Sequence, residues 1–316
     1  MRVLVTGGSG FIGGRLIPKL VECGHEVYSL ERYVTGRYVL GAKAMTVFGD
    51  LRDSFTIRKL VREVQPDSVI HLASISPVSF SYDHPQEVFE VNTLGTINLA
   101  ESCLREVPNF RQFLMAGTSE EYGNQTEIPI KEDAELRPNS PYAVSKVAAD
   151  KYLQYMCEAY DFPATVLRPF NTYGREDNTH FVVERTITQM LQGKKIKLGD
   201  PQPVRDFMYV DDHANAYLAC LGNKKVIGDI FNFCTGYGVS IKELIGQIAK
   251  LVGFDGEIIW GTIPTRPLDI KKLVGNCEKA KHVLGWKPKY TLEGGLRKTV
   301  DFWKHKLNMG DEEAAR

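Results

Sequence analysis

The first half of the chain alternates short apolar runs with amphipathic segments. Apolar runs of strand length lie at residues 2–7, 26–31, 44–50, 68–74, 112–119 and 163–170. Amphipathic segments with helical spacing lie between them, at residues 13–24, 56–65, 93–107 and 143–161. Strands that are buried on both faces have continuous apolar runs of this kind. The alternation therefore predicts an α/β fold, a doubly wound parallel sheet with helices on both faces.

The alternation loosens after about residue 168. Helical patterns remain at residues 181–193, 240–253 and 292–307. We expect a sheet domain over residues 1–168 and a smaller, mostly helical lobe over residues 169–307. No Gly/Ser/Pro-rich linker separates the two, so that an exchange of strands between them is compatible with this division. Residues 308–316 are expected to form a polar tail.

The composition is that of an ordinary soluble protein, with 43% hydrophobic and 25% charged residues. Lys plus Arg and Asp plus Glu number 39 each, so that no global field attracts nucleic acid or an anionic membrane. The sequence has neither an apolar stretch of membrane-spanning length nor a signal segment before the first strand. Six cysteines without a C-x-x-C pair indicate reduced thiols, and no metal-ligand cluster is seen. We expect a cytoplasmic protein without metal.

Three glycines lie between the first predicted strand and the first predicted helix. Gly7, Gly10 and Gly13 give the spacing G-x-x-G-x-x-G. Glycine permits a tight turn here and lets backbone N–H groups approach a pyrophosphate at the helix N-terminus. The loop therefore predicts a dinucleotide-binding Rossmann domain, with Phe11 and Ile12 also in contact with the cofactor.

The end of the second strand bears on the choice of cofactor. Glu31 lies where a carboxylate can bind the adenosine ribose and repel a 2′-phosphate, which favours NAD. Arg32 follows directly and would instead hold that phosphate, so NADP is the alternative; a solvent-facing ion pair is another interpretation. Further cofactor contacts are expected where the third and fourth strands end, at Asp50, Leu51, Leu72, Ala73 and Ser74.

A tyrosine and a lysine share one helix face in the sequence YAVSK. Tyr142 and Lys146 are four residues apart. A nearby ammonium and an oxidised nicotinamide both favour the phenolate, which then accepts a proton from an alcohol. An exposed Tyr/Lys pair without function would have the same spacing, and the glycine loop favours the catalytic interpretation.

The glycine loop and Y-x-x-x-K together resemble the extended short-chain dehydrogenase/reductase family, in the branch that acts on nucleotide sugars. Similar segments cover nearly the whole chain, among them NTLGT, RPFNTYG and GDPQPVRDFMYVDD. The resemblance implies that the second lobe binds a nucleoside diphosphate sugar and that Tyr142 and Lys146 also contact the cofactor. It implies the remaining cofactor and substrate contacts as well: Asn92 for the cofactor, and Ser76, Ser119, Asn171, Arg205 and Arg266 for the substrate. For Arg205, a salt bridge to Asp206 or Asp211 is the alternative.

The sequence TSEEYG resembles the 4,6-dehydratases and also the UDP-glucuronate decarboxylases. By this resemblance Thr118 hydrogen-bonds O4 of the sugar, Tyr142 is the base at O4, and Lys146 is its electrostatic partner. Glu120 is the C5 base and supplies the proton at C6. We therefore predict an NDP-hexose 4,6-dehydratase.

Other segments leave the substrate and the reaction open. THFVVERTITQ and RPLDIKKLVGN resemble the GDP-mannose 4,6-dehydratases and the GDP-4-keto-6-deoxymannose reductases. ITQMLQGKKIKLGD resembles dehydratases of N-acetylglucosamine nucleotides, and GGSGFIGG departs from the loop usual in GDP-mannose dehydratases. The alternatives are therefore the reductase, a 4-epimerase, a decarboxylase and a nucleotide-binding protein without activity.

The resemblance also implies a homodimer. Two helices of each subunit, the one after Asn92 and the one that carries Tyr142, would form a four-helix bundle. Apolar residues recur at roughly helical spacing on the second helix, at Val144, Ala148, Tyr152 and Tyr155. These side chains would alternatively pack inside the monomer.

Overall fold

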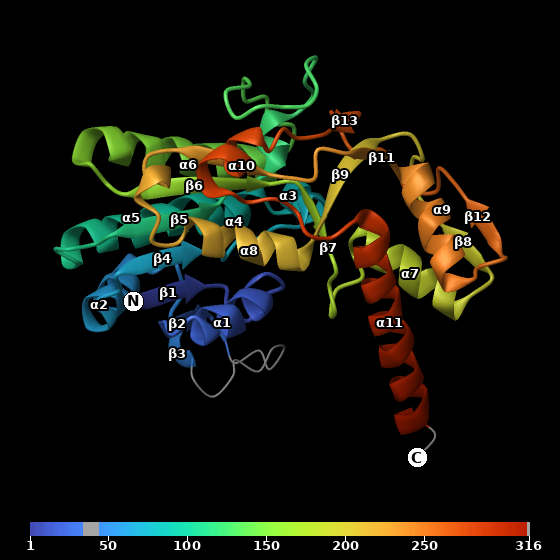
Figure 1. Ribbon diagram of the computed structural model, residues 1–316, viewed down its shortest axis with the longest axis horizontal. Helices are drawn as coiled ribbons and strands as arrows, with labels where there is room; N and C mark the ends of the chain where they lie inside the picture. Colours follow the sequence, from blue (N-terminus) through green and yellow to red (C-terminus); the bar gives the residue numbers. More distant parts are fainter. Residues whose placement is uncertain (34–43, 315–316) are drawn as a thin grey trace.

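The protein folds into a seven-stranded parallel sheet flanked by helices, with a second lobe beside it (Figure 1). This computed structural model describes residues 1–33 and 44–314, with side chains up to residue 308. From edge to edge the strands are β10 (Ile230–Phe233), β6 (Ala164–Pro169), β5 (Gln112–Ala116), β4 (Ser68–His71), β1 (Arg2–Thr6), β2 (Glu26–Glu31) and β3 (Ala44–Phe48). The predicted parallel α/β sheet is confirmed.

Helices cover both faces of this sheet. One face carries α2 (Ser54–Val64), α5 (Gly95–Glu106) and α6 (Pro141–Tyr160); the other carries α1 (Gly13–Glu22), α8 (Val210–Cys220) and α10 (Glu278–Leu284). The side chains of β1 alternate between two buried clusters, with Val3 and Val5 in one and Leu4 in the other. This alternation explains the continuous apolar run, because both faces of the strand are inside the protein.

The chain leaves the sheet after β6 and returns to it much later. β10 pairs in parallel with β6, and α8 packs against α1. Segments on both sides of residue 168 therefore build the sheet layer. The assignment of the rest of residues 169–307 to substrate binding stays a prediction.

The second lobe packs three helices against short strands. The helices are α7 (Val182–Gln192), α9 (Ile241–Val252) and α11 (Leu292–Ala314). The strands are β7 (Asn171–Tyr173), β9 (Val204–Tyr209), β11 (Gly238–Ser240) and β13 (Lys272–Leu273) in one sheet, and β8 (Lys195–Lys197) with β12 (Glu257–Ile259) in another. Their shared core includes Ile187, Ile245 and Val300, all buried. The second lobe lies next to the ends of the strands of the seven-stranded sheet, so the second lobe and the sheet domain meet there (Figure 1).

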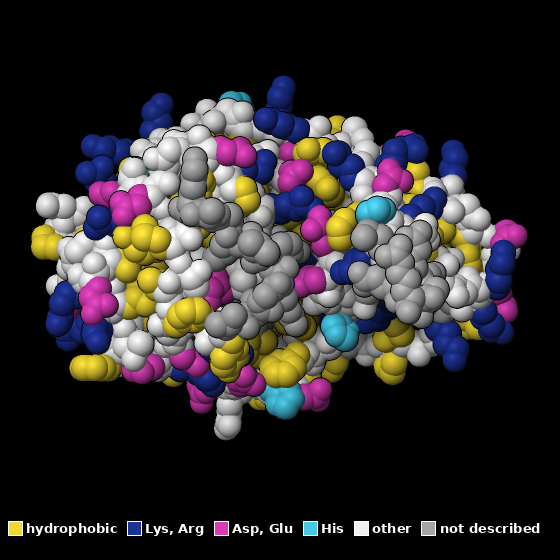
Figure 2. Space-filling view, turned by 90° about the horizontal axis from the view of Figure 1, so that it is seen from below, with side chains coloured by type: hydrophobic (Ala, Val, Ile, Leu, Met, Phe, Trp, Pro, Cys, Tyr) yellow, Lys and Arg dark blue, Asp and Glu magenta, His cyan; other side chains and the backbone are white. Residues whose placement is uncertain are grey.

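The surface carries charges of both signs. Figure 2 shows Lys and Arg side chains interspersed with Asp and Glu over the face seen from below. Among the described residues, none of the helices has the length and apolar character needed to cross a membrane.

Candidate active site

A cavity of about 480 Å³ lies where the carboxyl ends of the central strands meet the second lobe. Fifteen of the predicted site residues line it: Gly7, Gly10, Phe11, Ile12, Gly13, Leu72, Ala73, Ser74, Ser76, Thr118, Ser119, Glu120, Tyr142, Lys146 and Asn171. Seven others do not: Glu31, Arg32, Asp50, Leu51, Asn92, Arg205 and Arg266. The structure thus brings together the glycine loop, the turn after β5 and the start of α6, which are far apart in the sequence.

The glycine loop is packed too closely for side chains. Gly7 has a φ of +70°, and a Cβ there would lie 2.9 Å from the backbone N of Ala73. A Cβ on Gly13 would lie 2.5 Å from the carbonyl oxygen of Gly7. The backbone of the loop therefore packs closely against the strand ends, and the cavity beside it has room for a ligand.

The start of α1 suits a pyrophosphate. Ile12 precedes the helix without a side-chain cap, and the first turn, which is described throughout, has no acidic residue. The backbone N–H groups of Gly14, Arg15 and Leu16 donate to the carbonyls of Gly10 and Ile12, whereas none of the described hydrogen bonds uses those of Phe11, Ile12 and Gly13. The helix dipole favours negative charge beside these N–H groups. These residues fit the phosphates of a dinucleotide.

Glu31 contacts the glycine loop. Its carboxylate accepts hydrogen bonds from the backbone N of Ser9 at 2.9 Å and from the hydroxyls of Ser9 and Ser29. Arg32 is exposed and lies over the ring of Tyr33, with its guanidinium carbon 4.6 Å from the ring centroid. The alternative of a Glu31–Arg32 ion pair is therefore not observed in the described contacts. The carboxylate of Glu31 stays at the end of β2, beside the loop.

The neighbouring predicted contacts have other partners. Asp50 accepts hydrogen bonds from Arg52, which lower the pKa of the Asp50 carboxyl, and Leu51 is buried. Asn92 is buried and accepts from the backbone N of Ile75 at 2.8 Å, while its amide donates to Ser145 Oγ at 3.1 Å. Asn92 thus ties the loop after β4 to α6, and its predicted contact with the cofactor stays a prediction.

Tyr142 and Lys146 both lie on the buried face of α6. Ser140 caps this helix and Pro141 starts it, which places Tyr142 in the first turn. Lys146 Nζ donates to the carbonyl of Ala116 at 2.7 Å, and burial lowers the pKa of Lys146 to about 8. Burial raises the pKa of Tyr142, against which a hydrogen bond with Thr118 acts. A positive charge near Tyr142 is therefore needed to lower the pKa of Tyr142 so that its phenolate forms.

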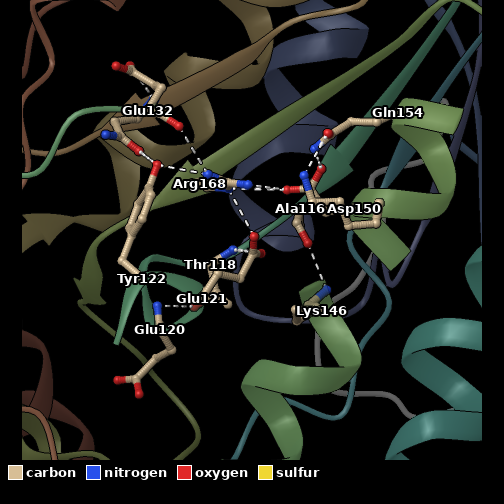
Figure 3. Close-up of polar contacts among 12 residues, drawn as sticks. Ala116, Thr118, Glu120, Glu121, Tyr122, Glu132, Lys146, Asp150, Gln154 and Arg168 are labelled. Carbon is tan, nitrogen blue, oxygen red and sulfur yellow. Dashed lines mark hydrogen bonds and ion pairs between the residues drawn. The ribbon is translucent and has the colours of Figure 1, made fainter. Parts of the chain in front are cut away.

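Thr118 begins a tight turn after β5, η2 (Ser119–Tyr122). Its Oγ1 accepts from the backbone N of Glu120 at 3.3 Å, and its own N donates to Glu121 Oε1 at 2.9 Å. This reciprocal cap fixes the turn (Figure 3). Thr118 and Glu120 both line the cavity.

Glu120 is a buried carboxyl group facing the cavity. Its Oε2 has no hydrogen-bond partner among the described residues. Burial raises the pKa of Glu120, while the charges of Arg266 and Arg205 act to lower it. An unpartnered buried carboxyl oxygen is costly for stability, which points to a use in chemistry or binding.

The predicted substrate arginines lie next to Glu120, outside the lining of the cavity. Arg205 is buried, and its guanidinium lies 3.6 Å from Asp269; Arg266 donates to the same carboxylate at 2.8 Å. The alternative pairing of Arg205 with Asp206 or Asp211 is not the one observed: Asp206 accepts from Thr235 and Gly236, and Asp211 accepts from Tyr290. Two guanidinium groups near one cavity suit a diphosphate.

Several lining residues were not predicted. His213, on α8, is buried, with Nδ1 2.9 Å from Thr172 Oγ1 and no described partner for Nε2. Burial lowers the pKa of His213 to about 3, so the ring is neutral. The guanidinium of Arg175 lies 4.3 Å from the ring centroid of Phe11 and 3.5 Å from that of Phe181. No role was predicted for His213 or Phe181, although Phe181 lies in the segment THFVVERTITQ, because the sequence pattern there is that of ordinary helix and loop.

Fold and site together define a dinucleotide-binding protein with a tyrosine–lysine pair beside its glycine loop. Residues 4–299 match the model of a family described as GDP-mannose 4,6 dehydratase. The chain belongs to the extended short-chain dehydrogenase/reductase family, in the branch that modifies nucleotide sugars.

Its relatives in this branch carry out different reactions. A UDP-glucose 4-epimerase of Mycolicibacterium smegmatis is 33% identical, with 97% of this chain and 99% of the relative covered. A dTDP-glucose 4,6-dehydratase of Xanthomonas campestris pv. campestris is 30% identical, with 95% and 92% covered. A GDP-6-deoxy-D-mannose reductase of Pseudomonas aeruginosa is 31% identical, with 97% and 98% covered.

Similar solved structures contain ligands at their sites. A Thermus thermophilus UDP-glucose 4-epimerase in complex with NAD has a TM-score of 0.88 and 34% identity, with 96% of this chain and 99% of that chain covered. A Bacillus cereus UDP-glucuronic acid 4-epimerase, in complex with UDP-glucuronic acid and NAD, has a TM-score of 0.88 and 27% identity, with 97% and 100% covered.

Proposed function

We propose that the protein is a nucleotide-sugar 4,6-dehydratase that uses bound NAD. The observation that carries the proposal is Glu120, a buried carboxyl group in the cavity beside Thr118 and Tyr142. Removal of the C5 proton needs a base placed next to the groups that act at C4. Burial raises the pKa of Glu120, which makes its carboxylate a stronger base.

Tyr142, Lys146 and Thr118 act on O4 of the sugar. NAD, held by the glycine loop of Gly7, Gly10 and Gly13, would supply the hydride acceptor for C4 and the hydride donor for C6. Tyr142 takes the hydroxyl proton from O4, and the Lys146 ammonium stabilises the phenolate. Thr118 Oγ1 hydrogen-bonds O4 and holds it toward Tyr142.

Glu120 acts on the neighbouring carbons once C4 is a ketone. The ketone makes the C5 proton acidic, and Glu120 removes it. The same carboxyl group then gives this proton to the C6 hydroxyl, which leaves as water. C5 takes a new proton from solvent when C6 is reduced. Arg205 and Arg266 bind the diphosphate, and Asn171 and Ser119 bind the sugar.

The bound cofactor is expected to be NAD rather than NADP. A dehydratase keeps its cofactor through the cycle, and similar proteins are solved with NAD. The carboxylate of Glu31, beside the glycine loop, repels a 2′-phosphate. Purified protein, heat-denatured and filtered, should release NAD identifiable by mass. Recovery of NADP alone would contradict this expectation.

A 4-epimerase is the second candidate, favoured by the names of relatives such as the M. smegmatis protein. Epimerisation uses Tyr142, Lys146 and Thr118 but no base at C5, so Glu120 would have no chemical part. The 4-reductase, suggested by the P. aeruginosa relative, also needs no such base. A decarboxylase is disfavoured because Asp177, two residues after Arg175, lines the cavity and opposes a substrate carboxylate, while Glu176 pairs with Arg15.

A homodimer built from α5 and α6 is also proposed. On α6, Val144 and Tyr155 are 40% and 48% exposed, and Leu94, just before α5, is 53% exposed. Tyr152 instead donates to Glu101 on α5 at 2.7 Å, within the monomer. Light scattering at micromolar concentration should give twice the chain mass, and Val144→Glu should give monomers. A monomer for the unaltered protein would refute the dimer.

A further inference from the structure

A buried cluster of charged side chains lies directly behind the candidate catalytic residues (Figure 3). Arg168, on β6, is 1% exposed, and Glu121 and Asp150 are fully buried. Arg168 Nη2 lies 2.5 Å from Asp150 Oδ2, and Arg168 Nε lies 2.9 Å from Glu121 Oε2. The hydroxyl of Tyr122 accepts from Arg168 Nη1 at 3.0 Å. One guanidinium thus joins two carboxyl groups from different elements.

Each carboxyl group lies on an element that carries candidate catalytic residues. Glu121 is in the η2 turn and accepts the backbone N–H of Thr118 at 2.9 Å. Asp150 is on α6, one turn beyond Lys146 and two turns beyond Tyr142. The chain of contacts Thr118–Glu121–Arg168–Asp150 therefore connects the η2 turn to α6. The hydrogen bond from Lys146 to Ala116 is a second connection between α6 and the end of β5.

The cost of this cluster argues for a purpose beyond stability. In proteins, a buried cluster of ionisable groups can often be replaced by apolar residues of similar volume without loss of stability. Burial, opposed by Arg168 and reinforced by Asp150, raises the pKa of Glu121 to about 8. Two buried carboxyl groups thus share one guanidinium. Hydrogen bonds join Arg168 to Asp150 and Tyr122, and an ion pair joins it to Glu121. These charged contacts fix relative position, which apolar packing does less well.

We propose that Glu121, Arg168 and Asp150 form a positioning bridge that holds Thr118 in register with Tyr142. The proposal rests on the proposed function only in so far as both residues act at O4, which the dehydratase, epimerase and reductase share. None of the three bridge residues lines the cavity, so each acts through another residue. Misplacement of a reacting group by about 1 Å can cost about 10²-fold in rate.

The test compares two substitutions at Glu121. Glu121→Leu removes the acceptor for Thr118 N and the contact with Arg168 at similar volume. Glu121→Gln keeps an oxygen for Thr118 N at nearly the same side-chain size. We expect kcat to fall about 10–10²-fold in the Leu variant with KM unchanged, and Gln to restore most of it. Equal loss in both variants, or a loss confined to KM, overturns the proposal.

A double-mutant cycle separates positioning from general destabilisation. If Glu121 acts through Thr118, Glu121→Leu should lower kcat little further in a protein that already carries Thr118→Val. If the two residues act independently, the two losses in kcat should multiply. Gln112→Leu is the matched control: it removes buried hydrogen bonds at the opposite end of β5, to Cys220 and Gly222. The control should lower the melting temperature and leave kcat unchanged. Multiplying effects in the cycle would rule out the bridge.

A crystal structure of the NAD-loaded Glu121→Leu variant gives a readout that needs no turnover. The bridge predicts that the turn at Thr118 moves away from Tyr142 relative to the unaltered protein; an unchanged turn overturns it. Turnover is measured with UDP-glucose, dTDP-glucose and GDP-mannose in turn. If none is oxidised at C4, the proposed function fails while the crystal comparison still decides the bridge. Arg168→Lys replaces Glu121→Leu if that variant does not fold, since one ammonium cannot span both carboxyl groups.

Discussion

Tyr142→Phe should abolish oxidation of the sugar at C4, so that no dinucleotide reduction follows addition of a nucleotide sugar. Tyr142 is buried in the cavity on α6, within hydrogen-bonding reach of Thr118 and one turn from Lys146. The phenyl ring fills the same space, so the fold and cofactor binding should be kept. Turnover should fall about 10²–10⁴-fold, the usual contribution of a general base.

The measurement is absorbance of the reduced dinucleotide in a single turnover, with the nucleotide sugar in excess. Tyr160→Phe is the matched control, because Tyr160 ends the same helix and is 51% exposed. It should behave like the unaltered protein. Reduction at a normal rate in Tyr142→Phe would show that another group takes the O4 proton.

The sheet was predictable because its central strands are buried on both faces. Continuous apolar runs such as the one in β1 have no other ready explanation at strand length, and the glycine loop fixed the order of strand, turn and helix. The tight packing at Gly7 and Gly13 shows why these positions carry glycine. Tyr142 and Lys146 were found for a similar reason, since helical spacing alone determines that they share a face.

Contacts between distant segments were not predictable in the same way. The pairing of Arg205 with Asp269 joins β9 to a loop more than sixty residues away, while Asp206 next to it offered a local partner. β10 joins β6 only because the chain returns to the sheet after passing through the second lobe. Neither arrangement leaves a periodic signal in the sequence.

Buried polar residues of the site were also missed for a physical reason. Glu121, Asp150 and His213 lie in segments whose pattern is helical or turn-like, where a polar residue is expected to face solvent. Each is buried by a neighbour that comes from elsewhere in the chain. Only the three-dimensional structure shows that Glu121 supports Thr118 while Glu120, the next residue along, faces the cavity.

Glu120→Gln should stall the reaction after oxidation at C4. The amide keeps the size of the side chain but cannot take the C5 proton, so dehydration should fall about 10²–10⁴-fold. Tyr142, Lys146 and Thr118 are unchanged, and reduction of the dinucleotide should therefore still occur. Glu106→Gln is the matched control, because its side chain is only 10% exposed and pairs with Arg58 and Arg62, away from the cavity.

Solvent exchange distinguishes the three candidate reactions in the unaltered protein. A panel of GDP-, UDP-, CDP- and dTDP-hexoses in D₂O, followed by mass spectrometry, should show loss of water and entry of one deuterium at C5. That deuterium enters because the proton that Glu120 removes leaves with the C6 water, so that the proton C5 receives afterwards comes from solvent. Epimerisation without exchange at C5 would assign the chain to the 4-epimerases. Consumption of added NAD(P)H with a 4-keto-6-deoxy sugar, and no dehydration of any hexose, would assign it to the reductases and leave Glu120 without a chemical role.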